Sequence, residues 1–288
     1  MLKTRVITAI VLLAVLLPIT FFAPVGVFAA LIAVVVIFAA WEWARLLKLT
    51  GGSPVVYAVI AGMALIASTR LGLGYKPLYQ MAAIFWVLAG PFALARKPAL
   101  ADGAWRVFLL FAGIVTFVAC WHALVAARTI GVAFVLSLLL VVWLADIGAY
   151  FAGKAFGRHK LAPSISPGKT REGALGGWLA VMIVGSAGAA TLVFAPTLFS
   201  ALVQHLGWAG ALLSLTVLTV FSVIGDLFES LLKRQAGVKD SSGLLPGHGG
   251  VLDRIDAFCP YCRLHSCCSV LLPSQSANRL KKDLCKNV

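Results

Sequence analysis

The sequence predicts an all-α, polytopic membrane protein with about eight transmembrane helices. Of its 288 residues, 61% are hydrophobic and only 12% are charged, whereas apolar residues make up roughly half of an ordinary soluble domain. Several apolar stretches approach or reach the ~20 residues that a helix needs to cross the bilayer core. The Lys and Arg residues behind the net charge of +14 lie in short connectors between these stretches. They form no single basic face, so we expect no nucleic-acid partner.

Eight apolar stretches are the candidate membrane helices. They cover residues 6–22, 25–44, 55–69, 79–95, 105–126, 130–151, 174–195 and 208–228. Gly62 and Pro91 lie inside the third and fourth stretches, so we expect these two to tilt, break or line a cavity. The small residues at 185–190 favour close helix packing in lipid. The first stretch imitates a signal peptide, but it lacks a convincing cleavage site, and we expect it to be retained as a helix.

Positive charge is unevenly distributed between the connectors. If the N-terminus is cytoplasmic, the connectors on the other side of the membrane hold only Arg70, Lys76 and Arg128. The segments 152–173 and 229–256 are the richest in Lys and Arg, and the positive-inside rule places both of them in the cytoplasm. We therefore expect a multi-pass protein of the inner (cytoplasmic) membrane whose active site faces the cytoplasm.

Seven of the ten acidic residues fall between residues 146 and 256. A carboxylate at membrane depth is costly unless it is paired, hydrated or bound to a cation. Asp146 lies near the end of a long apolar stretch, where an ion pair or a headgroup contact is the alternative to a functional role. Asp226, Glu229 and Lys233 have the spacing of one helical face. Two acids and a base are therefore expected to face one space.

A glycine-rich run at residues 239–250 follows this helix, and two further carboxylates follow the run. Glycines allow backbone N–H groups to approach an anion closely. Carboxylates are hard oxygen ligands for Mg²⁺, which completes its shell with water and substrate phosphates, and Lys and Arg neutralise phosphates. Together these features predict a metal-assisted nucleotidyl-transfer site. The expected metal ligands are Asp226 and Asp253 first, and then Glu229, Asp146 and Asp256.

The segment from Ser230 to Asp256 resembles the hallmark motif of the phosphatidate cytidylyltransferases, or CDP-diacylglycerol synthases. It reads SLLKR, four further residues, and then KDSSGLLPGHGGVLDRID, with every spacing intact. Residues 166–173 are similar to a second loop of the family, although Gly168 and Arg171 stand where the family usually has Lys and Trp. The likeness covers roughly residues 1–258, which we take as one membrane-embedded cytidylyltransferase domain.

The resemblance implies an enzyme that transfers the cytidylyl group of CTP to phosphatidic acid, giving CDP-diacylglycerol and pyrophosphate in phospholipid biosynthesis. It implies Mg²⁺ as the cofactor and the lipid bilayer as the setting, and it leaves the oligomeric state open, a homodimer included. The residues expected to be catalytic are Asp226, Asp253, Lys233 and Lys239. The residues expected to bind CTP or pyrophosphate are Ser166, Lys169, Arg234, His248, Gly249, Gly250 and Arg254.

Two other functions stay open at this point. A CTP-dependent lipid kinase of the polyprenol type would use similar parts to transfer the γ-phosphate instead. An ion-coupled transporter would place Asp146 and Asp226 on its pathway, but it leaves the glycine-rich segment unexplained. The products distinguish the first two functions, since the transferase gives a CDP-lipid and pyrophosphate and the kinase gives a phospholipid and CDP.

The last thirty residues differ in character from the rest. Residues 259–288 hold five of the six Cys residues and have a basic end, where the resemblance implies one more membrane helix. Their Cys and His spacing lacks the paired arrangement of a zinc site. We interpret this segment as an atypical Cys-rich tail, either out of frame or disordered, and whether it leaves the chain active is open.

Overall fold

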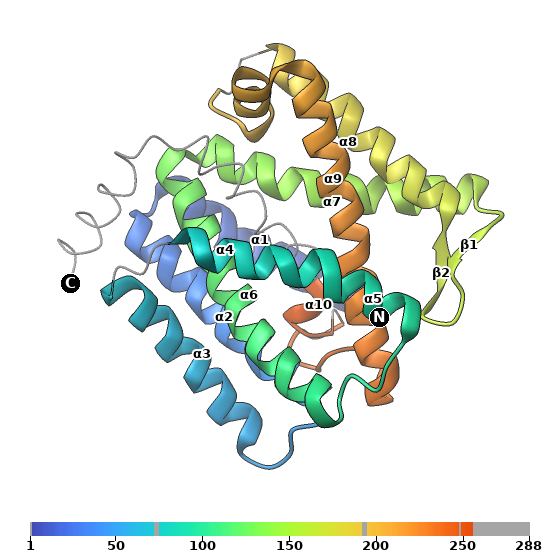
Figure 1. Ribbon diagram of the computed structural model, residues 1–288. Helices are drawn as coiled ribbons and strands as arrows, with labels where there is room; N and C mark the ends of the chain where they lie inside the picture. The colour runs from blue at the N-terminus through green and yellow to red at the C-terminus, as the bar shows by residue number, and fades with distance from the viewer. Residues whose placement is uncertain (1, 72–74, 192–194, 248, 256–288) are drawn as a thin grey trace.

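A computed structural model describes residues 2–71, 75–191, 195–247 and 249–255. Within these residues the chain is almost entirely helical (Figure 1), which confirms the predicted all-α class. The Cys-rich tail lies outside the described residues. The elements in chain order are α1 (Leu2–Phe22), α2 (Val25–Leu46), α3 (Ser53–Arg70), α4 (Tyr75–Ile84), the π-helical turn η1 (Phe85–Ala89), α5 (Gly90–Arg96), α6 (Gly103–Ile130), α7 (Val132–Phe156), β1 (Lys160–Ala162), β2 (Ser166–Thr170), α8 (Arg171–Thr191), α9 (Leu198–Ala236) and α10 (Leu252–Ile255).

Seven helical segments in the described part of the chain are long and apolar enough to cross a membrane, so the chain is a multi-pass membrane protein. They are α2, α3, the segment Lys76–Arg96, α6, α7, α8 and α9. Each of the eight predicted stretches coincides for most of its described residues with helix. The first of them differs from the others, because the apolar part of α1 covers only Val6–Phe22 and falls short of the length of the other seven.

The fourth predicted stretch, within the segment Lys76–Arg96, stays helical but changes its hydrogen-bonding pattern next to its proline. Helix α4 passes into η1 directly before Gly90 and Pro91, and α5 continues from there. Proline has no N–H to donate, and its ring crowds the preceding turn. A local change to π-helical hydrogen bonding accommodates such a site. Gly62, by contrast, lies within the uninterrupted α3, where an added Cβ would sit 3.4 Å from Ile37 of α2.

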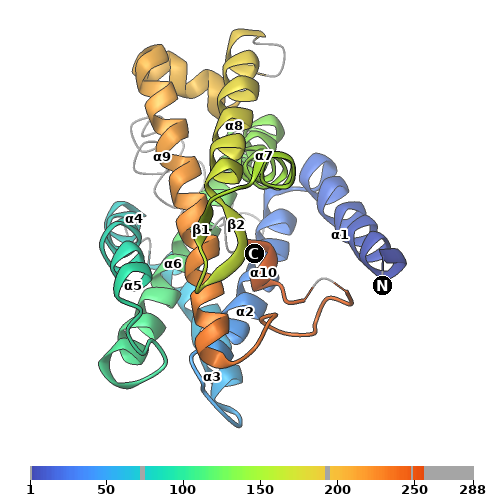
Figure 2. The ribbon, with the colours of Figure 1, turned by 90° about the vertical axis from the view of Figure 1, so that its right-hand side faces the viewer.

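Helices α7, α8 and α9 pack against one another and form one side of the molecule (Figure 2). A Cβ added at Gly177 of α8 would overlap the backbone carbonyl of Ala145 in α7. Such small residues allow helix backbones to approach closely in lipid. A Cβ at Gly185 would lie 2.9 Å from Leu215 of α9, which confirms the close packing predicted for residues 185–190.

Helix α9 is longer than the predicted segment 208–228. It begins at Leu198 behind a capping box formed by Thr197 and Ser200, bends at Gly207, where φ is 68°, and ends at Ala236 before Gly237 in the left-handed region. Basic residues in a last turn interact favourably with the helix dipole. The polar sequence after residue 228 therefore continues the helix instead of ending it.

A two-stranded antiparallel hairpin, β1–β2, lies between α7 and α8, and the sequence analysis did not predict it. Its register pairs Lys160 with Thr170. The turn is held from two sides. Arg234 of α9 donates from Nε to the carbonyl of Ile165 at 3.2 Å, and Lys97 donates from Nζ to Ser164 Oγ at 2.5 Å. These contacts fix the hairpin beside the end of α9.

Candidate active site

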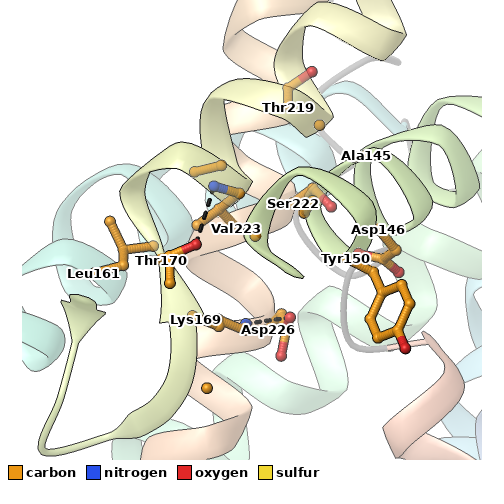
Figure 3. A pocket seen from close by; sticks show the side chains of 16 residues that line it. Ala145, Asp146, Tyr150, Leu161, Lys169, Thr170, Thr219, Ser222, Val223 and Asp226 are labelled. Carbon is orange, nitrogen blue, oxygen red and sulfur yellow. Dashed lines mark hydrogen bonds and ion pairs between the residues drawn. The ribbon is translucent and has the colours of Figure 1, made fainter. Parts of the chain in front are cut away.

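A cavity of about 320 Å³ is bordered by α7, α8, α9 and the hairpin (Figure 3). Its charged lining residues are Asp146 of α7, Lys169 of β2 and Asp226 of α9. The hydroxyls of Tyr150, Thr219 and Ser222 belong to residues that also line it, together with several Gly and Ala residues. The cavity thus combines two carboxylates, one cation and a few hydroxyls within mostly small side chains.

Lys169 and Asp226 form an ion pair across this cavity, drawn as a dashed line in Figure 3. The hairpin supplies the lysine and α9 supplies the carboxylate, and their side chains are 26% and 32% exposed. The Lys169 Nζ atom itself is buried, so its charge requires an anionic partner. A phosphate entering the cavity would supply such a partner in place of Asp226.

Asp146 reaches the same cavity from the neighbouring helix. It follows Ala145, the residue against whose carbonyl Gly177 packs, and it is exposed. The close approach of α7 and α8 places its carboxylate beside the cavity that Asp226 lines from the other side. Two of the predicted metal ligands, far apart in sequence, are therefore brought to one cavity.

A second charged cluster contains Glu229, Lys233 and Asp253. Lys233 Nζ lies 3.0 Å from Glu229 Oε2 and 2.7 Å from Asp253 Oδ1. All three side chains are nearly buried, and none of them lines the cavity. The i,i+4 pairing of Glu229 and Lys233 agrees with the predicted helical face. Asp226 faces the cavity instead. The two acids and the lysine, which were expected to face one space, therefore face two separate sites.

Asp253 is surrounded by donors from the protein itself. Its Oδ2 accepts from the Ser241 N–H at 3.0 Å and from the Gly250 N–H at 2.7 Å, and it shares the single hydroxyl proton of Ser241, also at 3.0 Å, with Glu42. Burial alone would raise the pKa of this carboxyl, but the hydrogen bonds from Lys233 and Gly250 outweigh burial and hold the pKa at about 2. Asp253 is therefore ionised, and both of its oxygens are already hydrogen-bonded.

Backbone N–H groups of the glycine-rich loop donate to anionic groups, but these groups are carboxylates of the protein itself. The Gly250 N–H donates to Asp253. A Cβ at Gly249, where φ is 80°, would lie 2.5 Å from the same carboxylate. A Cβ added at Gly250 would overlap the side chains of Ser241 and Glu42. The two glycines are thus required by the internal packing of the loop, and their predicted contacts with a nucleotide stay predictions.

The other predicted ligand-binding residues lie around these two clusters. Ser166 begins β2 and is half-buried. Arg234 binds the hairpin turn, while Lys239 is exposed in the loop after α9 and Arg254 is exposed in α10. His248 and Asp256 lie outside the described residues.

One candidate for a functional role, Glu42 of α2, was not predicted from the sequence. Its side chain is fully buried, and it accepts hydrogen bonds from residues 237–251 between α9 and α10, which we call the motif loop. The available signal was its isolation, because it is the single acid in an otherwise apolar stretch. The principle that singled out Asp146 makes such a residue a candidate for function.

The cavity fits a Mg²⁺ ion with few protein ligands. No group of three or more His, Cys, Asp or Glu side chains that could hold a metal occurs among the residues that the structure describes. Mg²⁺ does not require such a group, because it commonly takes one or two carboxylates and completes its shell with water and phosphates. Asp146 and Asp226 supply two carboxylates at this cavity, and their role as Mg²⁺ ligands stays a prediction.

The fold and the site together define a multi-pass membrane protein with a charged cavity between α7, α8, α9 and the hairpin. The model of the cytidylyltransferase family matches residues 3–270, and the chain belongs to this family of nucleotidyltransferases. It is similar to the phosphatidate cytidylyltransferase of Pseudomonas aeruginosa, with 41% identity over 89% of this chain and 93% of the relative. The phosphatidate cytidylyltransferase of Haemophilus influenzae is 33% identical over 89% of this chain and 94% of the relative. That of Brucella suis is 52% identical over a shorter part, 41% of this chain and 40% of the relative.

Proposed function

We propose that this protein joins CTP to phosphatidic acid, giving CDP-diacylglycerol and pyrophosphate. The observation that carries the proposal is the cavity in which Asp146, Lys169 and Asp226 meet. It lies between membrane helices, where a lipid headgroup can enter while the acyl chains stay in the bilayer. The names of the relatives that match nearly the whole chain support the same reaction.

In this reaction a phosphate oxygen of phosphatidic acid forms a bond to the α-phosphorus of CTP. The bond from that phosphorus to the oxygen bridging to the β-phosphate breaks, and pyrophosphate leaves with the electron pair. The nucleophile is already an anion, so no strong general base is required. The main obstacle is the repulsion between two highly charged phosphates, which is overcome by positioning and by charge stabilisation.

The residues of the cavity divide this work between them. Lys169 is the cation within the cavity and would contact a phosphate of CTP when a ligand displaces it from Asp226. Asp146 and Asp226 would hold Mg²⁺, which supplies charge stabilisation to the bound phosphates. Lys233 is held by Glu229 and Asp253, so we assign these two acids to positioning that lysine.

We also propose that the cavity opens toward the cytoplasm of a bacterial inner membrane. The hairpin, the end of α9 and the motif loop carry the richest groups of Lys and Arg, which favours a cytoplasmic position for them. CTP would then reach the site from the cytoplasm. Labelling of a cysteine introduced at Lys160 by a reagent that stays outside the cell would contradict this orientation.

Two labels on CTP test the reaction. The purified protein, in detergent with phosphatidic acid and Mg²⁺, is given CTP labelled either in the α- or in the γ-phosphate. We expect the α-label in a lipid product and the γ-label in pyrophosphate. Transfer of the γ-label to lipid would identify a kinase instead, and the absence of any lipid-dependent CTP consumption would refute both.

A matched pair of lysine variants connects the reaction to the cavity. Lys169→Met removes the cation that lines the cavity, and we expect kcat/KM for CTP to fall by about 10-fold or more, the loss of one charge-assisted contact. Lys160→Met removes an exposed lysine from the other strand of the same hairpin and should leave kcat/KM unchanged. If the two substitutions changed kcat/KM equally, the proposal that CTP binds in this cavity would be refuted.

A further inference from the structure

Glu42 lies in α2, almost two hundred residues before the motif loop, and its carboxylate is buried against that loop. The whole Glu42 residue is 0% exposed. Oε1 accepts from the Ser242 hydroxyl at 2.5 Å and from the Val251 N–H at 3.0 Å. Oε2 accepts from the Ser241 hydroxyl at 3.0 Å and from the Leu252 N–H at 2.6 Å. Every one of these four donors belongs to the loop between α9 and α10 or to the first turn of α10.

This arrangement joins the two ends of the loop. Ser241 and Ser242 stand near its beginning, while Val251 and Leu252 stand at its end. A buried carboxylate is costly unless it is hydrogen-bonded, and bonds to an ionised acceptor are roughly twice as strong as neutral ones. The need to satisfy the carboxylate therefore holds both ends of the loop against α2. Helix α2 is itself packed against α9, with Trp43 stacked on Phe228 at 6.0 Å between ring centroids.

The contacts continue from Glu42 to the buried lysine of α9. The Ser241 hydroxyl lies 3.0 Å from both Glu42 Oε2 and Asp253 Oδ2. The other oxygen of Asp253 accepts from Lys233 at 2.7 Å. Gly250 completes the arrangement, because any side chain there would occupy the space of Glu42 and Ser241. A displacement of Glu42 would thus reach Lys233 through two intermediate side chains.

We propose that Glu42 is a positioning residue for the reaction, which holds the motif loop in the arrangement where Asp253 fixes Lys233. It does not line the cavity, so it acts through the loop and not on the substrate. This inference rests on the proposed cytidylyl transfer for its kinetic readout, and on the loop contacts alone for its structural readout.

The test uses Glu42→Gln in the full-length protein, in detergent. Glutamine has the same shape, but its NH₂ group cannot accept, so either Val251 or Leu252 loses its acceptor. Hydrogen exchange followed by mass spectrometry should show amides at 249–254 exchanging about 5- to 30-fold faster, as expected for 1–2 kcal/mol of lost hydrogen bonding. The turnover number per folded molecule should fall by about 10-fold or more, while KM for CTP changes little, because the cavity is intact.

Two further variants separate positioning from a general loss of stability. Ser68→Ala removes another buried hydroxyl, which bonds to His122 at 2.8 Å far from the loop, and it should leave both loop exchange and turnover per folded molecule unchanged. Ser241→Ala breaks the connection to Asp253. Because the two residues act in one chain of contacts, the double variant of Glu42→Gln and Ser241→Ala should be no slower than the slower single variant, within about 2-fold.

The outcomes are distinct. Normal turnover per folded Glu42→Gln molecule, or the same loss in Ser68→Ala, would overturn the positioning role and leave a purely structural one. Unchanged exchange at 249–254 would overturn the loop contact itself. If Glu42→Gln does not fold, Ser242→Ala, which removes a single donor, takes its place with the same two readouts. If the wild-type protein does not turn over CTP, the proposed function fails, and the exchange experiment alone decides whether Glu42 holds the loop.

Discussion

Replacing Asp253 by Asn tests whether this carboxylate serves mainly the loop or a metal ion. The side chain is 8% exposed and Lys233 is 15% exposed, so the pair is nearly buried. Removing one partner of such a pair costs about 3–5 kcal/mol. Lys233 keeps Glu229 at 3.0 Å, which places the expected loss at the lower end, about 3 kcal/mol. With an unfolding entropy of roughly 2 cal/mol/K per residue, this loss corresponds to a midpoint about 5 °C lower.

The assay is thermal unfolding in detergent, followed by tryptophan fluorescence, together with pyrophosphate release per folded molecule. Asp240→Asn is the matched control, since it removes an exposed acid from the same loop and should not shift the midpoint. A wild-type midpoint in Asp253→Asn with collapsed turnover would refute the reasoning from the contacts and restore Asp253 as a metal ligand. A lower midpoint together with reduced turnover in the folded fraction is the expected result, because Asp253 positions Lys233. A lower midpoint with normal turnover would limit Asp253 to stability and would count against the positioning of Lys233.

Three further outcomes are expected. Asp226→Asn should lower turnover at saturating Mg²⁺ by at least about 100-fold, since even outer contacts of metal ligands cost 10- to 100-fold; a similar Mg²⁺ dependence to wild type would count against the ligand role. Gly177→Ala should lower the midpoint, because its Cβ overlaps the Ala145 carbonyl and overpacking costs about 1–3 kcal/mol, whereas Gly26→Ala, with open space around it, should not. The pKa of Asp253 is held at about 2, below its ordinary value of ~3.9, so its contribution to stability is present above about pH 4 and is lost as the pH falls through the folded value. The difference in midpoint between wild type and Asp253→Asn should therefore narrow between about pH 4 and 2, and a constant difference would contradict the assignment.

The membrane helices could be predicted from the sequence because hydrophobicity and length act locally. Each of the eight predicted stretches coincides for most of its described residues with helix, and Pro91 follows a π-helical turn. The apolar stretch 208–228 is shorter than α9, which runs from Leu198 to Ala236 and includes the helical face predicted through Lys233. Hydropathy measures the preference for lipid, whereas a helix continues into water when its backbone and its last charges are satisfied.

Within the site, contacts along one helix could be predicted, whereas contacts between distant segments could not. The predicted helical face contains the Glu229–Lys233 pair, since i,i+4 contacts need no knowledge of the fold. Asp226 pairs instead with Lys169 of the hairpin, a contact between segments distant in sequence. Glu42 could not be connected to the loop by any local rule, because the contact depends on how α2 packs against α9.

The distance along the chain between Glu42 and its partners has a consequence for how the protein is made. The donors follow the acid by 199 to 210 residues, so α2 enters the membrane long before they are synthesised. Until then the carboxylate must remain hydrated or otherwise paired, since a bare charge at that depth is costly. The final burial of α2 therefore waits for the motif loop, and completion of the charged site and closure of the helical bundle are expected to occur in one late step of assembly.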